Sequence, residues 1–100
     1  MEVVTLESPE VDRCLDALLD LVCTCNLKTL LVARDGVVVL PEAYRGLRLE
    51  EAVEKVCDVC LILRGAGRTY VFSFFTIKMG VGNLAKLVAE VCGGSVQPPP

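Results

Sequence analysis

The chain has no histidine and no tryptophan, and three phenylalanines and two tyrosines supply all of its aromatic rings. A serine or cysteine nucleophile usually takes its proton-accepting partner from histidine, so this absence argues against catalysis of the Ser–His or Cys–His kind. The acidic residues fall mainly on solvent-facing positions of predicted helices, where an acid–base catalyst is not expected. We therefore expect a protein that is not an enzyme and that holds no cofactor.

Clustered basic residues and long apolar runs are also missing. The ten lysines and arginines are scattered in a chain of net charge −3, which argues against a nucleic-acid partner because phosphate binding needs clustered cations. The longest apolar stretches, such as Val37–Leu40 and Tyr70–Phe75, are far too short to cross a bilayer. The start at Met1–Val4 lacks the pattern of a signal peptide, so we expect a cytoplasmic protein without a membrane span.

Apolar residues, by contrast, are abundant. They make up 53% of the 100 residues, and sixteen of them are valine. One domain of this length has a modest core, so we expect surplus apolar surface to be buried in a homodimer. A well-filled core within one chain is the alternative. Side-chain amides occur at Asn26, Asn83 and Gln97 alone, which together with the valines suits a thermophilic source.

The first quarter of the chain predicts a helix over residues 9–25. Ser8, Pro9 and Glu10 supply a capping hydroxyl, a first-position proline and an acid at the positive helix end. Apolar residues then recur at steps of three and four and form one stripe: Val11, Cys14, Leu15, Leu18, Val22 and Cys25. This stripe should pack on the core.

The rest of the chain alternates between strand and helix patterns. Asp35-Gly36 separates two β-rich runs and predicts a two-residue hairpin. The predicted elements are strands over 30–34 and 37–40, a helix over 49–57, a buried strand over 59–63, a long central strand over 68–77 and a third helix from Leu84 to Val91, opened by a Gly80–Gly82 loop with Asn83 as cap. We expect a single α/β domain over 1–94, with four to five strands, and a disordered or extended proline-rich tail over 95–100.

Six cysteines allow several readings. Cys23 and Cys25 form a C-x-C pair, and Cys57 and Cys60 form a C-x2-C pair. Buried free thiols, at least one disulfide, and a zinc site made by these four thiolates are all open, and the apolar setting of the pairs disfavours zinc. Two further cysteines, Cys14 and Cys92, lie on core-facing stripes and are expected simply to pack.

Two segments resemble the roadblock/LC7 family. The run 30–39, an apolar strand, a charged pair, a glycine and a second apolar strand, looks like the first hairpin of that family. The run 70–91, an apolar strand, a glycine-containing loop and the start of a helix, looks like its last strand and last helix. The sequence departs from the family pattern in two places. Lys28-Thr29 replaces the small residue pair common before the first strand, and the stretch from Cys57 to Lys78 has room for two strands where the family usually has three.

The resemblance implies a three-layer α-β-α sandwich around an antiparallel sheet of up to five strands, with two helices on one face and one on the other. It also implies a dimer joined through strand edges and the middle helix. Members of the family are scaffolds or regulators for small GTPases, or subunits of motor complexes. On this reading the interface includes these residues: Leu49, Val53, Val56, Leu61 and Leu63.

Two alternatives remain open at this stage. Counting Met1–Leu6 as a strand gives the order β-α-β-β-α-β, which favours a ferredoxin-like fold with a C-terminal extension and places this segment centrally in the sheet. The functional alternative is a small metal-binding or redox-sensitive protein based on its cysteines.

Overall fold

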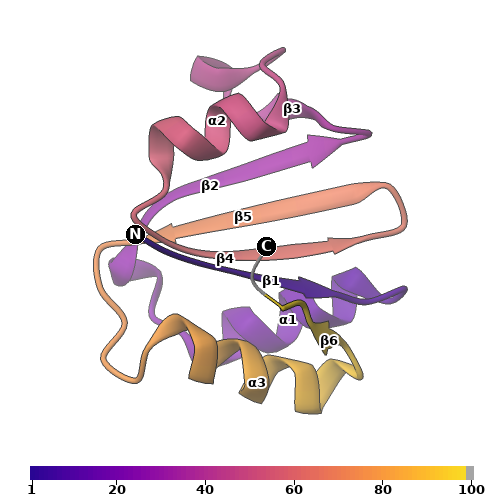
Figure 1. The fold of residues 1–100 in the computed structure, drawn as a ribbon, viewed down its shortest axis with the longest axis vertical. Coiled ribbons are helices and arrows are strands. Elements are labelled where there is room, and N and C mark those ends of the chain that lie inside the picture. Colours follow the sequence, from indigo (N-terminus) through magenta and orange to yellow (C-terminus); the bar gives the residue numbers. More distant parts are fainter. Residues whose placement is uncertain (99–100) are drawn as a thin grey trace.

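Helices and strands alternate along the whole chain in the computed structural model, which describes residues 1–98 (Figure 1). In chain order the elements are β1 (Glu2–Glu7), α1 (Val11–Leu21), the 3₁₀ turn η1 (Thr24–Asn26), β2 (Leu27–Arg34), β3 (Val37–Leu40), the 3₁₀ turn η2 (Glu42–Tyr44), α2 (Leu49–Val56), β4 (Val59–Gly65), β5 (Arg68–Phe74), α3 (Val81–Cys92) and β6 (Ser95–Val96). The protein thus has the mixed α/β character that its sequence predicts.

One open sheet of six strands organises these elements in the order β3-β2-β5-β4-β1-β6. Four of the five pairings are antiparallel. The exception joins β1 to β4 in parallel, with Glu2 opposite Val59 and Glu7 opposite Arg64. The strands β4 and β5 lie in the middle, and both carry apolar side chains on both faces, so the expectation of a central strand after residue 68 is confirmed.

The two hairpins of the sheet have tight turns of the same kind. Asp35 and Gly36, between β2 and β3, have φ angles of 51° and 82°. Ala66 and Gly67, between β4 and β5, have φ angles of 53° and 75°. Positive φ at both central positions matches the right-handed twist of the flanking strands, so the predicted Asp-Gly hairpin is confirmed.

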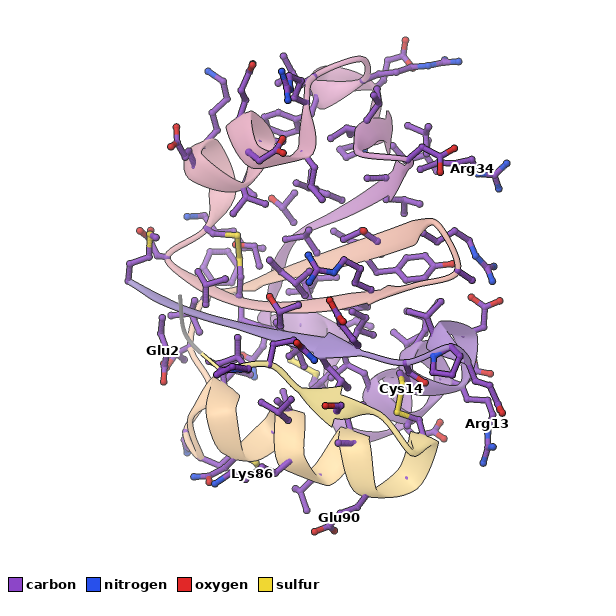
Figure 2. All side chains as sticks on the ribbon, turned by 45° about the vertical axis from the view of Figure 1, so that its right-hand side comes forward. Glu2, Arg13, Cys14, Arg34, Lys86 and Glu90 are labelled. Atoms are coloured by element: carbon purple, nitrogen blue, oxygen red, sulfur yellow. A yellow bond between two sulfur atoms is a disulfide. The ribbon has the colours of Figure 1, made fainter. Side chains whose placement is uncertain are left out.

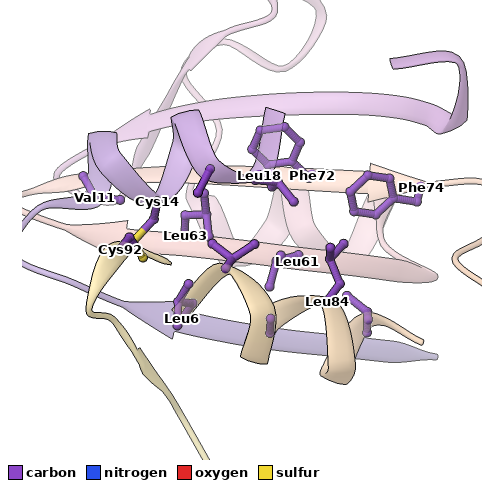
Figure 3. Close-up of a cluster of buried hydrophobic side chains, with 14 residues drawn as sticks. Leu6, Val11, Cys14, Leu18, Leu61, Leu63, Phe72, Phe74, Leu84 and Cys92 are labelled. Carbon is purple, nitrogen blue, oxygen red and sulfur yellow. A yellow bond between two sulfur atoms is a disulfide. The ribbon is translucent and has the colours of Figure 1, made fainter. Parts of the chain in front are cut away.

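Helices cover both faces of the sheet, α1 and α3 on one and α2 on the other (Figure 1). Alternation along β4 shows the division, because Leu61 and Leu63 pack under α1 and α3 whereas Cys60 and Ile62 pack under α2. The larger core lies between α1, α3 and strands β1, β4 and β5, and Figure 3 shows Phe72 and Phe74 within it, with ring centroids 6.2 Å apart.

Helices α1 and α3 differ from the sequence prediction in their boundaries. The helix expected over 9–25 begins at Val11, because the Glu10 N–H donates to the Ser8 hydroxyl at 3.0 Å and forms a separate turn ahead of the helix. It ends at Leu21, and the residues beyond form η1. The third helix begins at Val81 rather than after the glycine loop.

Asn83 does not cap that helix either. It lies inside the first turn, and its side-chain amide donates to the Met79 carbonyl at 2.7 Å. The N-cap position belongs to Gly80, whose φ of 88° suits glycine.

The sheet also differs from prediction in strand number and direction. It has six strands rather than four to five, and it is mixed rather than wholly antiparallel. The segment 2–7 forms β1, but β1 lies next to the edge and not at the centre that the ferredoxin-like alternative requires. The strand β5 ends at Phe74, three residues earlier than expected.

The C-terminal segment takes part in the fold. Ser95 and Val96 form β6 against Leu6 and Glu7, and the Gln97 N–H donates to the Thr5 carbonyl at 2.8 Å. The ordered domain therefore extends past the expected boundary at 94. The rest of the predicted tail, residues 99–100, lies outside the described residues.

Gly65 allows the chain before α1 to lie against the end of β4. The Ser8 N–H donates to the Arg64 carbonyl at 3.0 Å, and a Cβ at Gly65 would overlap the Ser8 carbonyl group. We expect Gly65→Ala to lower the free energy of unfolding by about 2–3 kcal/mol, because backbone on both sides must shift. Chemical denaturation monitored by circular dichroism measures this change.

The matched control is Gly82→Ala, where an added Cβ meets no atom within 4 Å. Since Gly82 lies in the first turn of α3, alanine should leave stability unchanged or raise it by up to about 1 kcal/mol. Equal losses in the two variants would contradict the close approach at Gly65.

Candidate interaction surfaces and cysteine pairs

The three helices leave part of each sheet face uncovered. Helices α1 and α3 contact β1 and β4, and α2 contacts β3, which lies at the opposite end of the sheet. One uncovered part is formed by β2 and β3 on the side of α1. The other, on the side of α2, surrounds Thr5 of β1 and Arg64 of β4, beyond the buried Cys60 and Ile62.

The first uncovered part, which we name the β2–β3 face, is apolar. Its members are Leu30 and Val32 of β2 and Val37 and Val39 of β3, together with Leu19 of α1 on the same side of the sheet. Val37 and Val39 point away from the buried Val38, and they are 42% and 39% exposed. Leu19 of α1 is 44% exposed. Five apolar side chains gathered beside an edge strand are typical of a surface that a partner covers.

The outer edge of β3, in contrast, is already occupied. The Val38 N–H donates to the Leu47 carbonyl at 2.9 Å, and the Val38 carbonyl accepts from the Gly46 N–H at 2.9 Å. The Leu49 N–H donates to the Gly36 carbonyl at 2.9 Å as well. A loop that satisfies an edge strand in this way blocks pairing with another strand, so contact through this region has to use the face rather than the edge.

The second uncovered part forms a groove of about 630 Å³ beside α2. Leu49, Val53 and Ile62 supply its apolar lining, and Arg64 and Arg68 stand among its polar residues. We name it the α2 groove. The β2–β3 face holds a smaller hollow of about 390 Å³, whose lining includes Val32, Val39 and Tyr70.

The structure separates the five residues of the predicted interface. Leu49 and Val53 are half-buried and line the α2 groove. Val56 is 8% exposed and belongs to the core under α2. Leu61 and Leu63 are fully buried under α1 and α3, so they have no surface to offer a partner. The strand that carries them is paired on both edges, by β5 and by β1.

A polar cluster borders the β2–β3 face where α1 meets β5. Asp12 accepts hydrogen bonds from Arg68 Nη1 at 2.7 Å and from the Tyr70 hydroxyl at 3.1 Å. Burial raises the pKa of Tyr70, and the Asp12 carboxylate raises it further, while Arg68 acts in the opposite direction. The hydrogen bond to Asp12 and its charge raise the pKa of the Arg68 guanidinium, which is cationic in any case. The cluster fixes α1 against β5.

All six cysteines are paired in disulfides. Cys14 and Cys92, expected simply to pack, are joined across α1 and α3 with their Cα atoms 5.0 Å apart (Figures 2 and 3). This bridge closes a loop over a sequence separation of 78 and lies in the larger core, where the two residues are 1% and 4% exposed. In the chain-entropy description, a loop this long stabilises the fold by about 4 kcal/mol.

The other two disulfides are local. Cys57 and Cys60 connect the end of α2 to β4 and are buried, 4% and 0% exposed. Cys23 and Cys25 flank Thr24 at η1 and are both exposed. The alternative of a zinc site made by these four thiolates does not fit, because each pair is bonded internally. Among the described residues, no three metal-binding side chains of the His, Cys, Asp and Glu types gather.

Sequence reasoning missed most of the β2–β3 face. The sequence contains one indication of this face, because Val37 and Val39 alternate with the buried Val38 on a strand that ends before Pro41. The sequence does not indicate which part of each sheet face the helices leave uncovered.

Within residues 1–98, none of the helices combines the length and the apolar character needed to span a bilayer. Comparison of the chain with protein-family models, with curated proteins and with solved structures gives no match.

Removing the Cys14–Cys92 bridge should cost far more stability than removing the Cys23–Cys25 bridge. We expect the double variant Cys14→Ala/Cys92→Ala to lose about 4 kcal/mol of unfolding free energy, because its loop spans most of the chain. The control, Cys23→Ala/Cys25→Ala, should lose less than about 2 kcal/mol, since its loop holds three residues. Guanidinium unfolding under non-reducing conditions compares them. Similar losses would contradict the role of loop length.

Tyr70 should titrate above the ordinary range of tyrosine. The raised pKa means that the fold favours the neutral phenol, so this contribution to stability is full below the ordinary pKa and is lost as pH rises through the raised one. Asp12→Asn should move the pKa of Tyr70 downward. Tyrosinate absorbance in a Tyr44→Phe background isolates this residue. An unchanged titration would show that Asp12 does not act on it.

Proposed function

We propose that the protein is a non-enzymatic scaffold or regulatory module that works as a homodimer, joined through the β2–β3 face. The observation that carries this proposal is the exposed apolar surface beside β3, with Val37, Val39 and Leu19 each about two-fifths exposed. A surface of this kind is covered by a partner in many small domains.

A second copy of the chain suits this face for two reasons. A two-fold interface brings the same patch together twice, so the exposed Val37 and Val39 of each copy would bury apolar surface on the other. Exposed charges of both signs also lie near it, Asp16 on α1 and Arg34 at the end of β2. In the proposed two-fold arrangement Asp16 of one copy faces Arg34 of the other, which aligns the pair.

The α2 groove suits a different partner. Two copies of a concave groove cannot fill each other, so Leu49 and Val53 are better placed to receive a protein of another kind. A small GTPase is the partner class that the roadblock/LC7 resemblance favours. In this proposal the dimer presents two such grooves on its outer surface.

The observed order of elements supports part of that resemblance. A hairpin, a helix, a second hairpin and a last helix follow one another as β2–β3, α2, β4–β5 and α3. A third strand after α2 would pair with the outer edge of β4, and β1 occupies that edge. Our proposal therefore includes both the three-layer sandwich and membership of the roadblock/LC7 family.

Three disulfides limit where the protein can work. Such bonds persist in oxidising compartments and in the cytoplasm of hyperthermophiles. In this proposal, a cytoplasmic location therefore requires a thermophilic source. The valine content and the scarcity of amides suggest such a source.

Val39→Lys tests the dimer. We expect the native protein to show twice its chain mass of 10.8 kDa by light scattering. The lysine should raise the dimer dissociation constant at least about thirtyfold, because it places an unpaired charge at the centre of an apolar interface. Since Val39 is already 39% exposed, the monomer should keep its fold, which circular dichroism checks.

Val91→Lys is the matched control. Val91 is an exposed valine too, 59% exposed, but it lies on α3 away from the β2–β3 face. Its lysine variant should remain dimeric. A native protein that is monomeric at high concentration, or a dimer that Val39→Lys leaves intact, would overturn the proposed interface.

A further inference from the structure

The three disulfides differ in how easily another molecule can reach them. Cys14–Cys92 and Cys57–Cys60 are buried, with every one of the four residues at most 4% exposed. Cys23 and Cys25 are both exposed. Since thiol–disulfide exchange requires direct attack on a sulfur atom, exchange on the folded protein is open to this last pair.

A structural role does not account for the exposed pair. It closes a loop with a sequence separation of 2, which removes little freedom from the unfolded chain. The turn η1 is also held without it, because the Asn26 N–H donates to the Cys23 carbonyl at 3.1 Å. The Cys23–Cys25 bond therefore contributes little to the stability of the fold.

The local geometry favours a thiolate at Cys23 rather than at Cys25. The Cys25 backbone N–H donates to Cys23 Sγ at 3.3 Å. A donor at this position stabilises negative charge on the sulfur once the disulfide is opened, so Cys23 leaves readily from a mixed disulfide and is the sulfur that attacks a small disulfide when the bridge is restored. Cys25, two residues away, is within reach to close the ring again.

A groove for a substrate lies directly beside Cys23. Its volume is about 270 Å³, and its lining includes Cys23, Leu21, Ile77, Met79 and Lys78. Leu21 and Met79 are both 49% exposed. Methionine adapts to varied apolar surfaces, so this lining suits a short apolar peptide rather than a single rigid ligand.

We propose that Cys23–Cys25 is a thiol–disulfide exchange site for cysteine-containing apolar peptide segments. It is independent of the proposed dimer, because it lies at the end of α1 and uses none of the residues of the β2–β3 face.

The proposed exchange takes place in two steps. A substrate thiolate attacks Cys23 Sγ, the Cys23–Cys25 bond breaks, and Cys25 leaves as a thiolate that takes up a proton. A second substrate thiolate then attacks the substrate sulfur of the mixed disulfide, so that a substrate disulfide forms and Cys23 leaves with its electron pair. Two substrate thiols are oxidised by two electrons, and the protein gains two thiols. A small disulfide such as oxidised glutathione restores the bond by the reverse steps.

The first experiment sorts the cysteines by reactivity in the native protein. It is incubated with reduced and oxidised glutathione mixtures, alkylated and analysed by peptide mass spectrometry. We expect Cys23 and Cys25 to become alkylated in the folded protein while the four buried cysteines stay oxidised. Reduction of all three bridges together would overturn the proposal.

The second experiment measures exchange with a designed substrate, a peptide whose one cysteine stands between leucines. We expect the native protein to form the mixed disulfide at least about tenfold faster than the oxidised free peptide of residues 22–26 does, because the groove holds the substrate near Cys23. The same substrate with serines in place of leucines should lose this advantage. Equal rates for protein and free peptide would show an exposed bridge without a site.

Single variants assign the two sulfurs. With the leucine peptide supplied as its symmetric disulfide, the remaining thiolate attacks that disulfide and releases one peptide thiol. Cys25→Ser should then accumulate the mixed disulfide at Cys23, because no second cysteine resolves it, and Cys23→Ser should accumulate at least about tenfold less at Cys25. Both variants lack the same bridge, so loss of that bridge affects them alike. Equal trapping at the two positions would contradict Cys23 as the attacking sulfur. Met79→Ser, which keeps both cysteines, should slow reaction with the leucine peptide but not with glutathione.

Discussion

Both cores of the protein depend on the β4–β5 hairpin. Its two strands lie at the centre of the sheet, and their side chains alternate between the two faces. Leu61 and Phe72 enter the core under α1 and α3, while Ile62 and Val71 enter the core under α2. Ala66 and Gly67 set the turn that keeps these strands in register, so one local geometry fixes the positions of both cores.

The number of helices then determines what stays exposed. Six strands present two broad faces, and three helices, one of them only eight residues long, cannot cover both. Helices α1 and α3 are joined to each other through Cys14 and Cys92, and they form one unit over β1, β4 and β5. The apolar β2–β3 face is a direct consequence of this arrangement.

Much of this architecture could be predicted from local patterns. Asp35-Gly36 has a defined turn geometry, and the apolar stripe of α2 gives the inward face of that helix. A continuous apolar run such as 59–63 has no periodicity, however, and so could not show that Leu61 and Leu63 face α1 and α3 while Cys60 faces α2. Parallel pairing of β1 with β4 is a contact between distant segments, which no local pattern encodes.

The cysteines show the same limit. The helical stripes correctly placed Cys14 and Cys92 on inward faces, but a pairing across a sequence separation of 78 depends on how α1 and α3 lie against each other. Spacing alone likewise could not separate a C-x-C pair on an exposed turn from a C-x2-C pair in a core. Exposure, which follows from the fold, distinguishes a bridge that holds structure from one that can exchange.

The position of β1 connects these observations with the question of self-association. A strand edge at β4 would have offered main-chain groups for pairing, and β1 fills that edge from Glu2 to Glu7. At the other end of the sheet, the segment Gly46–Leu49 satisfies the outer groups beside β3. With these two edges occupied, strand addition is restricted to the outer edge of β1 ahead of Thr5, because the C-terminal segment pairs with Thr5, Leu6 and Glu7. The exposed valines of β3 lie on a face and not on an edge. In the proposed dimer, contact between copies uses these side chains and leaves the α2 groove and the exposed cysteine turn free.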